Sequence, residues 1–230
     1  MEFIILEFEE KIREINEYFN FVQTTTHLTR EFDETRTIVV SETVHHVLKS
    51  NLFLLLYNLI ESSFKNSLEK ICTEITADEL MYQNVVPQIK QMWINTKYKN
   101  FDETCAIPRE IQKSKFVMNK IDTIAQDIVN IRFDSKLSGN VTPEIIKKSI
   151  KEYGLETHQI SEQNSSSLFI IKDKRNNLAH GNESFSECGR NYTLLKLDEI
   201  KNESTNYMRF ILTHIKIFIE DKKYKLPEES

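Results

Sequence analysis

The run of nearly continuous apolar residues from Leu52 to Ile60 constrains the fold more than any other feature of the chain. Apolar residues recur at helical spacing on both sides of it, and together they are Val44, Val47, Leu48, Leu52, Leu55, Leu56, Leu59, Ile60, Phe64, Leu68 and Ile71. The run is too short to cross a membrane and it contains Asn58. A helix that is apolar almost all round needs neighbours on every side, so the pattern predicts a central core helix. We expect this helix to begin after Ser41 or Thr43 and to end near Ile75.

Few residues along the chain can interrupt a helix. The 230 residues include only 4 Gly and 4 Pro, which favours long helices over tight turns. Helical spacing predicts further helices over residues 6–21, 84–98, 111–129, 142–154, 168–180 and 193–222, with loops over 100–108, 134–140 and 159–167 and a connector over 183–191. The sequence Thr142-Pro143-Glu144 has the cap, the proline and the acid of a helix start. The fold class predicted is all-α.

The stretch after the core helix is less apolar than the rest of the chain. We therefore expect one helical domain over residues 1–230, with a core formed by about 1–76 and 140–222. Residues from about 78 to 140 are interpreted as a helical insertion within that domain. The hydrophobic fraction of 40% is sufficient for a real core.

Charge limits how this protein can meet a nucleic acid. The formal net charge is −5, so the surface as a whole does not attract RNA, and any contact must come from a local basic patch. The candidates for such a patch are Lys172, Lys174, Arg175 and Arg190. A second cluster of Lys147, Lys148 and Lys151 is better explained as a solvated helix face.

Cysteine and histidine spacing predicts no metal site and no cofactor. Cys72, Cys105 and Cys188 are far apart and form no CxxC pair, so inert thiols are expected. The remaining histidines have no metal-ligand spacing, and they are His27, His45, His46, His158 and His214. The N-terminus has neither the basic start nor the cleavage site of a signal peptide, so we expect a cytoplasmic protein with no membrane partner.

The motif that carries chemistry is Arg175-Asn176-Asn177-Leu178-Ala179-His180-Gly181. Arginine offers a rigid cationic fork that suits phosphate, and histidine moves protons near neutral pH. RNA supplies its own nucleophile, the ribose 2′-OH, so a protein needs only a base, an acid and cationic donors to cleave it. We therefore interpret Arg175 as a phosphate ligand and His180 as base or acid, with Asn176 as a third catalytic candidate.

Helical geometry restricts how the two residues could cooperate. Five positions separate their directions by roughly 140° on an ideal helix. Both can act on one phosphate only if the helix ends or loosens near His180, which Gly181 allows.

Each site residue also has a purely structural interpretation. His180 could cap the last carbonyls of its helix, and Arg175 could form a surface ion pair with Asp173 or Glu183. Asn176 could face solvent or bond the backbone. Lys174, Arg190 and Tyr192 are candidates for RNA binding, but Arg190 and Tyr192 could equally fix the connector.

The stretch from Arg175 to Gly181 resembles the HEPN domain family. The residues that follow carry the resemblance to its MAE-like subfamily, and they are Ser184, Phe185, Glu187, Gly189, Arg190, Tyr192 and Thr193. Leu56-Tyr57-Asn58-Leu59-Ile60-Glu61 is similar to the core helix of that subfamily, which has an acidic residue after an apolar run. Glu61 is therefore a supporting candidate, as a buried partner for Arg175 or another cation. The structural alternative is a partly exposed glutamate with no role in the site.

The resemblance implies a HEPN-like helical bundle and a metal-independent endoribonuclease that acts as a toxin or an anti-phage defence effector. It implies a homodimer in which two Arg-His pairs share one cleft, an RNA substrate, and an antitoxin or defence-system partner protein. One feature departs from some HEPN toxins, since Asn182 stands where they carry a modified tyrosine. The alternative is a non-catalytic helical module that binds RNA or a partner protein.

Overall fold

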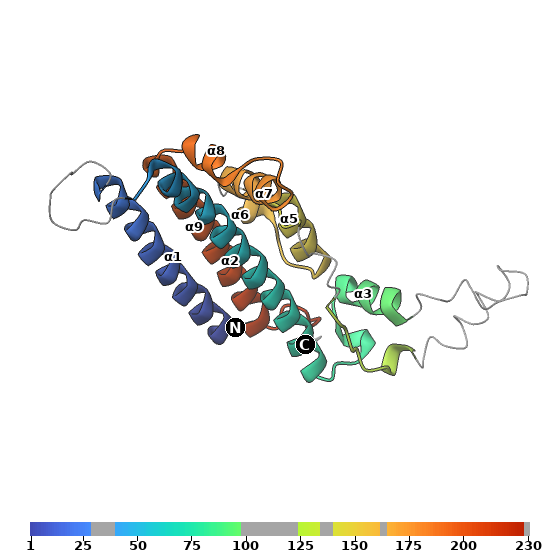
Figure 1. Cartoon of the computed structure of the whole chain (residues 1–230). Coiled ribbons are helices and arrows are strands. Elements are labelled where there is room, and N and C mark those ends of the chain that lie inside the picture. Colours follow the sequence, from blue (N-terminus) through green and yellow to red (C-terminus); the bar gives the residue numbers. More distant parts are fainter. Residues whose placement is uncertain (29–39, 98–123, 134–139, 162–164, 228–230) are drawn as a thin grey trace, which may run out of the picture.

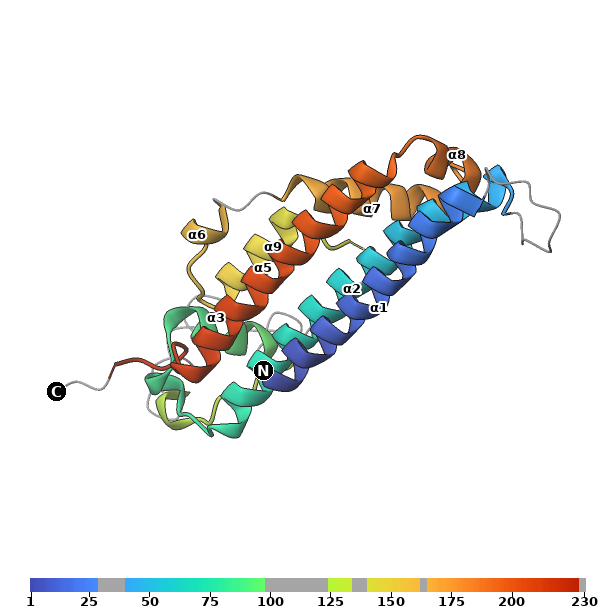
Figure 2. The same cartoon turned by 90° about the vertical axis from the view of Figure 1, so that its left-hand side faces the viewer.

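The computed structural model describes residues 1–28, 40–97, 124–133, 140–161 and 165–227. Over these residues the fold is all-α, as predicted. Three long helices lie side by side, α1 (Glu2–Leu28), α2 (Glu42–Ala77) and α9 (Leu194–Glu220) (Figures 1 and 2). The shorter helices α5 (Pro143–Glu152), α6 (His158–Ser161), α7 (Ser166–Ala179) and α8 (Phe185–Arg190) complete the bundle. The only β structure in the described ranges is two isolated bridges, Met81 with Ile128 and Val85 with Lys225.

Helix α2 is the central element, which confirms the prediction from its apolar run. It contacts α1, α7, α8 and α9. Its largest buried side chains include Leu52, Phe53, Leu56 and Tyr57, none of which is more than 1% exposed. Burying several large side chains along one helix, at about 25 cal/mol for each Å² of apolar surface, makes α2 a large contributor to the stability of the bundle.

Helix ends follow the capping residues of the sequence. Ser41 Oγ accepts a hydrogen bond from the backbone N–H of Val44 (3.3 Å), and Thr142 Oγ1 accepts one from that of Ile145 (3.3 Å). Helix α9 begins in the same way, with Thr193 Oγ1 accepting from Lys196 N (3.1 Å). Because these side chains satisfy N–H groups that have no intrahelical partner, the predicted starts of α2, α5 and α9 are close to the observed ones.

Some predicted elements differ from the structure. The expected connector over 183–191 contains α8, and the expected loop over 159–167 contains the end of α6 and the start of α7. The helix expected to run to Val129 has already ended at Gln126, because Tyr82 N donates to Asp127 O and Val129 N donates to Leu80 O (both 2.8 Å). Its earlier part and the expected loop over 100–108 lie outside the described residues, as does most of the loop over 134–140.

The bundle has two distinct ends. Helix α8 lies at one of them, next to the start of α2, and η1 (Tyr82–Asn84) and α3 (Pro87–Lys97) lie at the other (Figures 1 and 2). At this second end Val86 N donates to Tyr224 O (3.0 Å) and Leu226 N donates to Asn84 O (2.9 Å). The chain after α9 thus forms hydrogen bonds with the segment that we interpreted as an insertion. The division into core and insertion stays a prediction.

A bilayer-spanning segment would need a long stretch of apolar residues with few charges. None of the helices in the described ranges meets both conditions.

Candidate functional site

The sequence motif lies at the end of α7. The helix stops at Ala179, and the backbone N–H of His180 still donates to Asn176 O (3.0 Å). Gly181 then takes a φ of +70°, in the left-handed region that favours glycine, and Asn182 N donates to Asn177 O (2.9 Å). The prediction that the helix ends near His180 is therefore confirmed.

Arg175 is held from two sides. Its Cζ lies 4.7 Å from the centroid of the Tyr57 ring on α2. Its Nη1 donates a hydrogen bond to Asn176 Oδ1 (3.0 Å). No ion pair between Arg175 and Asp173 or Glu183 is present, so the surface ion pair suggested by the sequence is wrong. The guanidinium is positioned by an aromatic face and an amide, and neither neutralises its charge.

Tyr57 is a site residue that the sequence reasoning missed. Its side chain is 1% exposed, and its hydroxyl accepts a hydrogen bond from Val141 N (3.3 Å). Burial raises the pKa of this hydroxyl, and the charge of Glu61 adds to the increase whereas that of Arg175 opposes it. Both charges therefore lie close to Tyr57. The signal in the sequence was the spacing of Tyr57 and Glu61, which places them one helical turn apart on α2.

Glu61 is partly exposed. Its charge and that of Arg175 both act on the Tyr57 hydroxyl, and its role as a partner for Arg175 stays a prediction.

Lys174 and Tyr192 belong to a different cluster. Lys174 Nζ lies 2.9 Å from Glu183 Oε2, and the two side chains are only 19% and 17% exposed. The same Nζ lies 5.9 Å from the centroid of the Tyr192 ring, which packs edge-on against Phe53 at 4.9 Å between centroids. Although burial opposes it, the hydrogen bond with Glu183 raises the pKa of Lys174. This geometry favours a role for Lys174 and Tyr192 in fixing the chain between α7 and α9.

Helix α8 is positioned by a capping box and a glycine. Ser184 Oγ accepts from Glu187 N (3.2 Å), and Glu187 Oε2 accepts from Ser184 N (3.1 Å). A Cβ on Gly189 would lie 1.9 Å from the backbone oxygen of His46, so only glycine allows α8 to approach α2 this closely. Arg190 follows it and is exposed at the end of α8.

His180 is also exposed. No hydrogen bond or ion pair engages its imidazole in the part of the chain that the structure describes, and none joins it to Arg175. The backbone of His180 caps α7, but its side chain is not used for capping. The structure therefore leaves the histidine accessible at the helix end. About one turn earlier on α7, Arg175 and Asn176 contact each other, and Arg175 lies over the ring of Tyr57 from α2.

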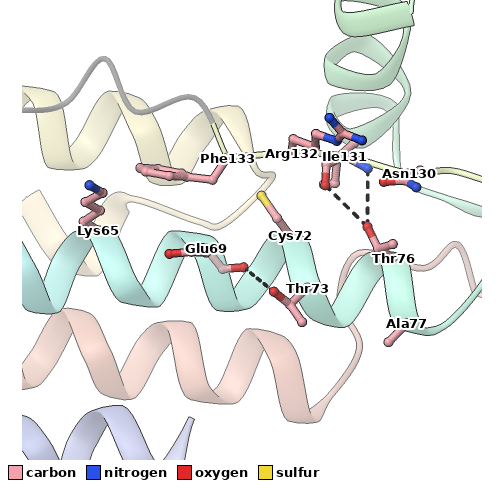
Figure 3. Close-up of a pocket in the computed structure, with 10 residues that line it drawn as sticks. All are labelled: Lys65, Glu69, Cys72, Thr73, Thr76, Ala77, Asn130, Ile131, Arg132 and Phe133. Atoms are coloured by element: carbon pink, nitrogen blue, oxygen red, sulfur yellow. Dashed lines mark hydrogen bonds between the residues drawn. The ribbon is translucent and has the colours of Figure 1, made fainter.

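A pocket of about 690 Å³ lies elsewhere on the molecule (Figure 3). It follows the second half of α2, from Lys65 to Ala77, and residues 130–133 form its other wall. Thr76 Oγ1 joins the two walls through bonds to the N–H and the carbonyl of Ile131 (both 3.4 Å). None of the predicted site residues lines this pocket. Within the described ranges, no group of three or more His, Cys, Asp or Glu could hold a metal ion.

The comparisons with known proteins agree with the motif and with the all-α fold. The family model described as HEPN_MAE_28990-like HEPN matches residues 2–224. No curated protein and no solved structure matches the chain. Because the family match extends over nearly the whole sequence, the chain belongs to the HEPN_MAE_28990-like HEPN family.

Proposed function

We propose that this protein is a metal-independent endoribonuclease. Arg175 binds the scissile phosphate through two parallel hydrogen bonds, and His180 acts as the base that accepts the 2′-OH proton or as the acid that protonates the leaving 5′ oxygen. The products are a 2′,3′-cyclic phosphate and a 5′-hydroxyl end.

One observation carries this proposal. The motif places an accessible imidazole at the end of α7 and, earlier on the same helix, a guanidinium that no carboxylate in the described ranges pairs with. A structural arginine is usually neutralised by an acid, whereas an arginine that binds phosphate must keep its charge and free donors. Proton transfer by a positioned side chain typically accelerates a reaction by about 10²–10⁴-fold, and we assign an acceleration of this size in RNA cleavage to His180.

The complete reaction needs more groups than one chain offers. One histidine cannot be both base and acid within the same step, but a two-fold dimer brings two copies of Arg175 and His180 around one axis. We therefore propose a homodimer with a shared cleft. Sedimentation of a fully active monomer would contradict this arrangement.

The biological role proposed is that of a toxin or an anti-phage defence effector in the cytoplasm, with an antitoxin or defence-system protein as its partner. The membership of the HEPN family supports this role. Because the net charge is −5, only a few basic residues can contact RNA, and the affinity they provide is weak and sensitive to salt. We therefore propose that a second component targets the enzyme to its RNA.

The test is cleavage of total cellular RNA and of tRNA by the purified protein in the presence of a metal chelator. His180→Ala and Arg175→Ala are expected to abolish cuts that carry 2′,3′-cyclic phosphate ends. His158→Ala, which removes another exposed histidine, on α6, is the matched control and is expected to cleave like the wild type. Cleavage by His180→Ala at the wild-type rate would show that the site assignment is wrong.

A non-catalytic module that binds RNA or a partner protein is the second candidate. The packing of Lys174 against Glu183 and of Tyr192 against Phe53 favours it, because two of the predicted RNA contacts are used within the fold. This candidate predicts no cleavage by the wild type and binding that changes little in His180→Ala.

A further inference from the structure

The orientation of Arg175 depends on a residue that is distant in sequence. The guanidinium carbon lies over the Tyr57 ring, 4.7 Å from its centroid, so the cation is next to an aromatic face. Attraction between a cation and the negative face of a ring holds the guanidinium there and leaves its charge intact.

The Tyr57 ring is itself fixed. It is 1% exposed within the core, and its hydroxyl accepts a hydrogen bond from the N–H of Val141, which immediately precedes Thr142, the N-cap of α5. A buried ring with a bonded hydroxyl cannot move without disturbing both α2 and this segment. The aromatic face over which Arg175 lies is therefore rigid.

Asn176 occupies a second side of the guanidinium. Arginine has five N–H donors, and the bond from Nη1 to Asn176 Oδ1 uses one of them. The edge formed by Nε and Nη2 keeps its two parallel donors, which is the arrangement that binds a phosphate through two bonds. Among the described residues, no hydrogen bond engages either of these two nitrogens.

We propose that Tyr57 is a positioning residue that holds Arg175 with its Nε and Nη2 edge directed to the RNA phosphate. Asn176 completes this support and acts through Arg175, not on the substrate. The inference rests on the proposed function for the identity of the anion, but the support of Arg175 by the ring is a property of the free protein.

The first experiment needs no RNA. A ring face shifts the proton signals of a group stacked on it upfield, so the Hδ and Hε signals of Arg175 in the wild-type NMR spectrum are expected upfield of ordinary arginine positions. Arg175→Lys assigns them. Tyr57→Phe keeps the ring and is expected to keep the shift, whereas Tyr57→Leu is expected to lose it. Ordinary positions for these signals in the wild type would overturn the proposal, even if Tyr57→Leu does not fold.

The second experiment measures RNA binding in the His180→Ala background, where the RNA stays intact. Fluorescence anisotropy with labelled tRNA is compared for Tyr57→Phe, Tyr57→Leu and Arg175→Ala, alone and combined. Tyr57→Leu is expected to weaken binding about tenfold, and Tyr57→Phe much less. Because Tyr57 acts through Arg175, the effect of Tyr57→Leu should disappear once Arg175 is alanine.

The outcomes separate the two proposals. An unchanged tenfold loss in the Arg175→Ala background would assign Tyr57 a merely structural role and overturn this inference. Absence of cleavage and of RNA binding in the wild type, together with the expected NMR shift, would contradict the proposed function and leave the support of Arg175 by Tyr57 established.

Discussion

The two ends of the helical bundle differ in the extent to which their charged side chains form ion pairs. The motif end consists of α7, α8 and the first half of α2, and the terminal end consists of the end of α2, η1, α3 and residues 221–227. At the terminal end Asp78 accepts hydrogen bonds from Lys222 Nζ (2.7 Å) and Tyr224 OH (2.8 Å), and Lys225 Nζ lies 3.0 Å away. At the motif end Arg175, His180 and Arg190 have no such carboxylate partner among the described residues.

The difference separates structure from chemistry. Asp78 caps the C-terminal end of α2, where the helix dipole disfavours a negative charge, and the surrounding donors offset that cost. These donors lower the pKa of Asp78 to about 2. Arg175 is held by a ring and an amide, so it is ordered and still charged. Pairing of Asp78 with several donors is what we expect of a structural cluster, and support of Arg175 without neutralisation is what we expect of a binding site.

The largest effect is expected when the packing of the motif end is disturbed, and it is measured as a loss in the free energy of unfolding. A Cβ at Gly189 would lie 1.9 Å from His46 O, and a backbone atom cannot rotate away as a side chain can. Gly189→Ala is expected to lower the free energy of unfolding by about 3 kcal/mol, measured by urea denaturation.

Gly181→Ala is the matched control for Gly189→Ala. Nothing lies within 4 Å of the Cβ it would gain, so only its φ of +70° opposes the substitution. This strain costs about 1 kcal/mol. Equal losses from the two substitutions would mean that the close approach of α8 to α2 does not limit stability.

The ion pair between Lys174 and Glu183 offers the next largest effect. Glu183→Gln leaves the amine of Lys174 in a partly buried place without a carboxylate, and we expect a loss of about 1–2 kcal/mol in thermal unfolding. Glu199→Gln breaks the exposed pair with Lys196 and should change stability by well under 1 kcal/mol. If both variants unfold alike, the Lys174 pair has no special structural role and this lysine becomes available again as an RNA contact.

A smaller effect is expected from Asp78, because its partner Lys222 is exposed. The folded state lowers the pKa of Asp78 from 3.8 to about 2, so its contribution to stability is present above about pH 4. It is lost as the pH falls toward 2. Urea denaturation of the wild type and Asp78→Asn across this range should show two curves that converge at low pH. A constant difference between them would contradict the assigned titration.

The smallest effect concerns a thiol at the motif end. Cys188 is a fully buried residue of α8, and burial raises the pKa of its thiol to about 11, so the thiol is protonated at pH 8. Iodoacetamide should leave Cys188 unmodified in the folded protein and alkylate it in urea. Peptide mass spectrometry measures the extent of alkylation. Rapid modification under native conditions would indicate that α8 opens readily and that the motif end is less rigid than its packing implies.

The fold was largely predictable because its signals are local. The apolar period of α2, the capping residues Ser41, Thr142 and Thr193, and the scarcity of glycine and proline all act within a few residues. The end of α7 at His180 was predictable for the same reason, since a glycine directly after the last turn allows the left-handed cap.

The candidate site was only partly predictable. Arg175, Asn176 and His180 could be found from their spacing, but the partner of Arg175 is Tyr57, which lies 118 positions earlier on another helix. Glu183 was considered as a partner for Arg175, but in the structure it pairs with Lys174, because side chains adjacent on α7 point in different directions. Helix α8 was missed because six residues with a glycine near their end carry too short a pattern to separate from a connector.

The sequence by itself determined which segments are helical, where several of them start and stop, and which residue types stand at the end of α7. Those properties depend on periodicity and on capping, which are interactions between near neighbours. Tertiary structure alone decided which charges are neutralised and which are supported, since that depends on what a neighbouring helix presents to each side chain. Lys174 and Arg175 are adjacent in the chain, yet one meets a carboxylate and the other meets the face of a ring.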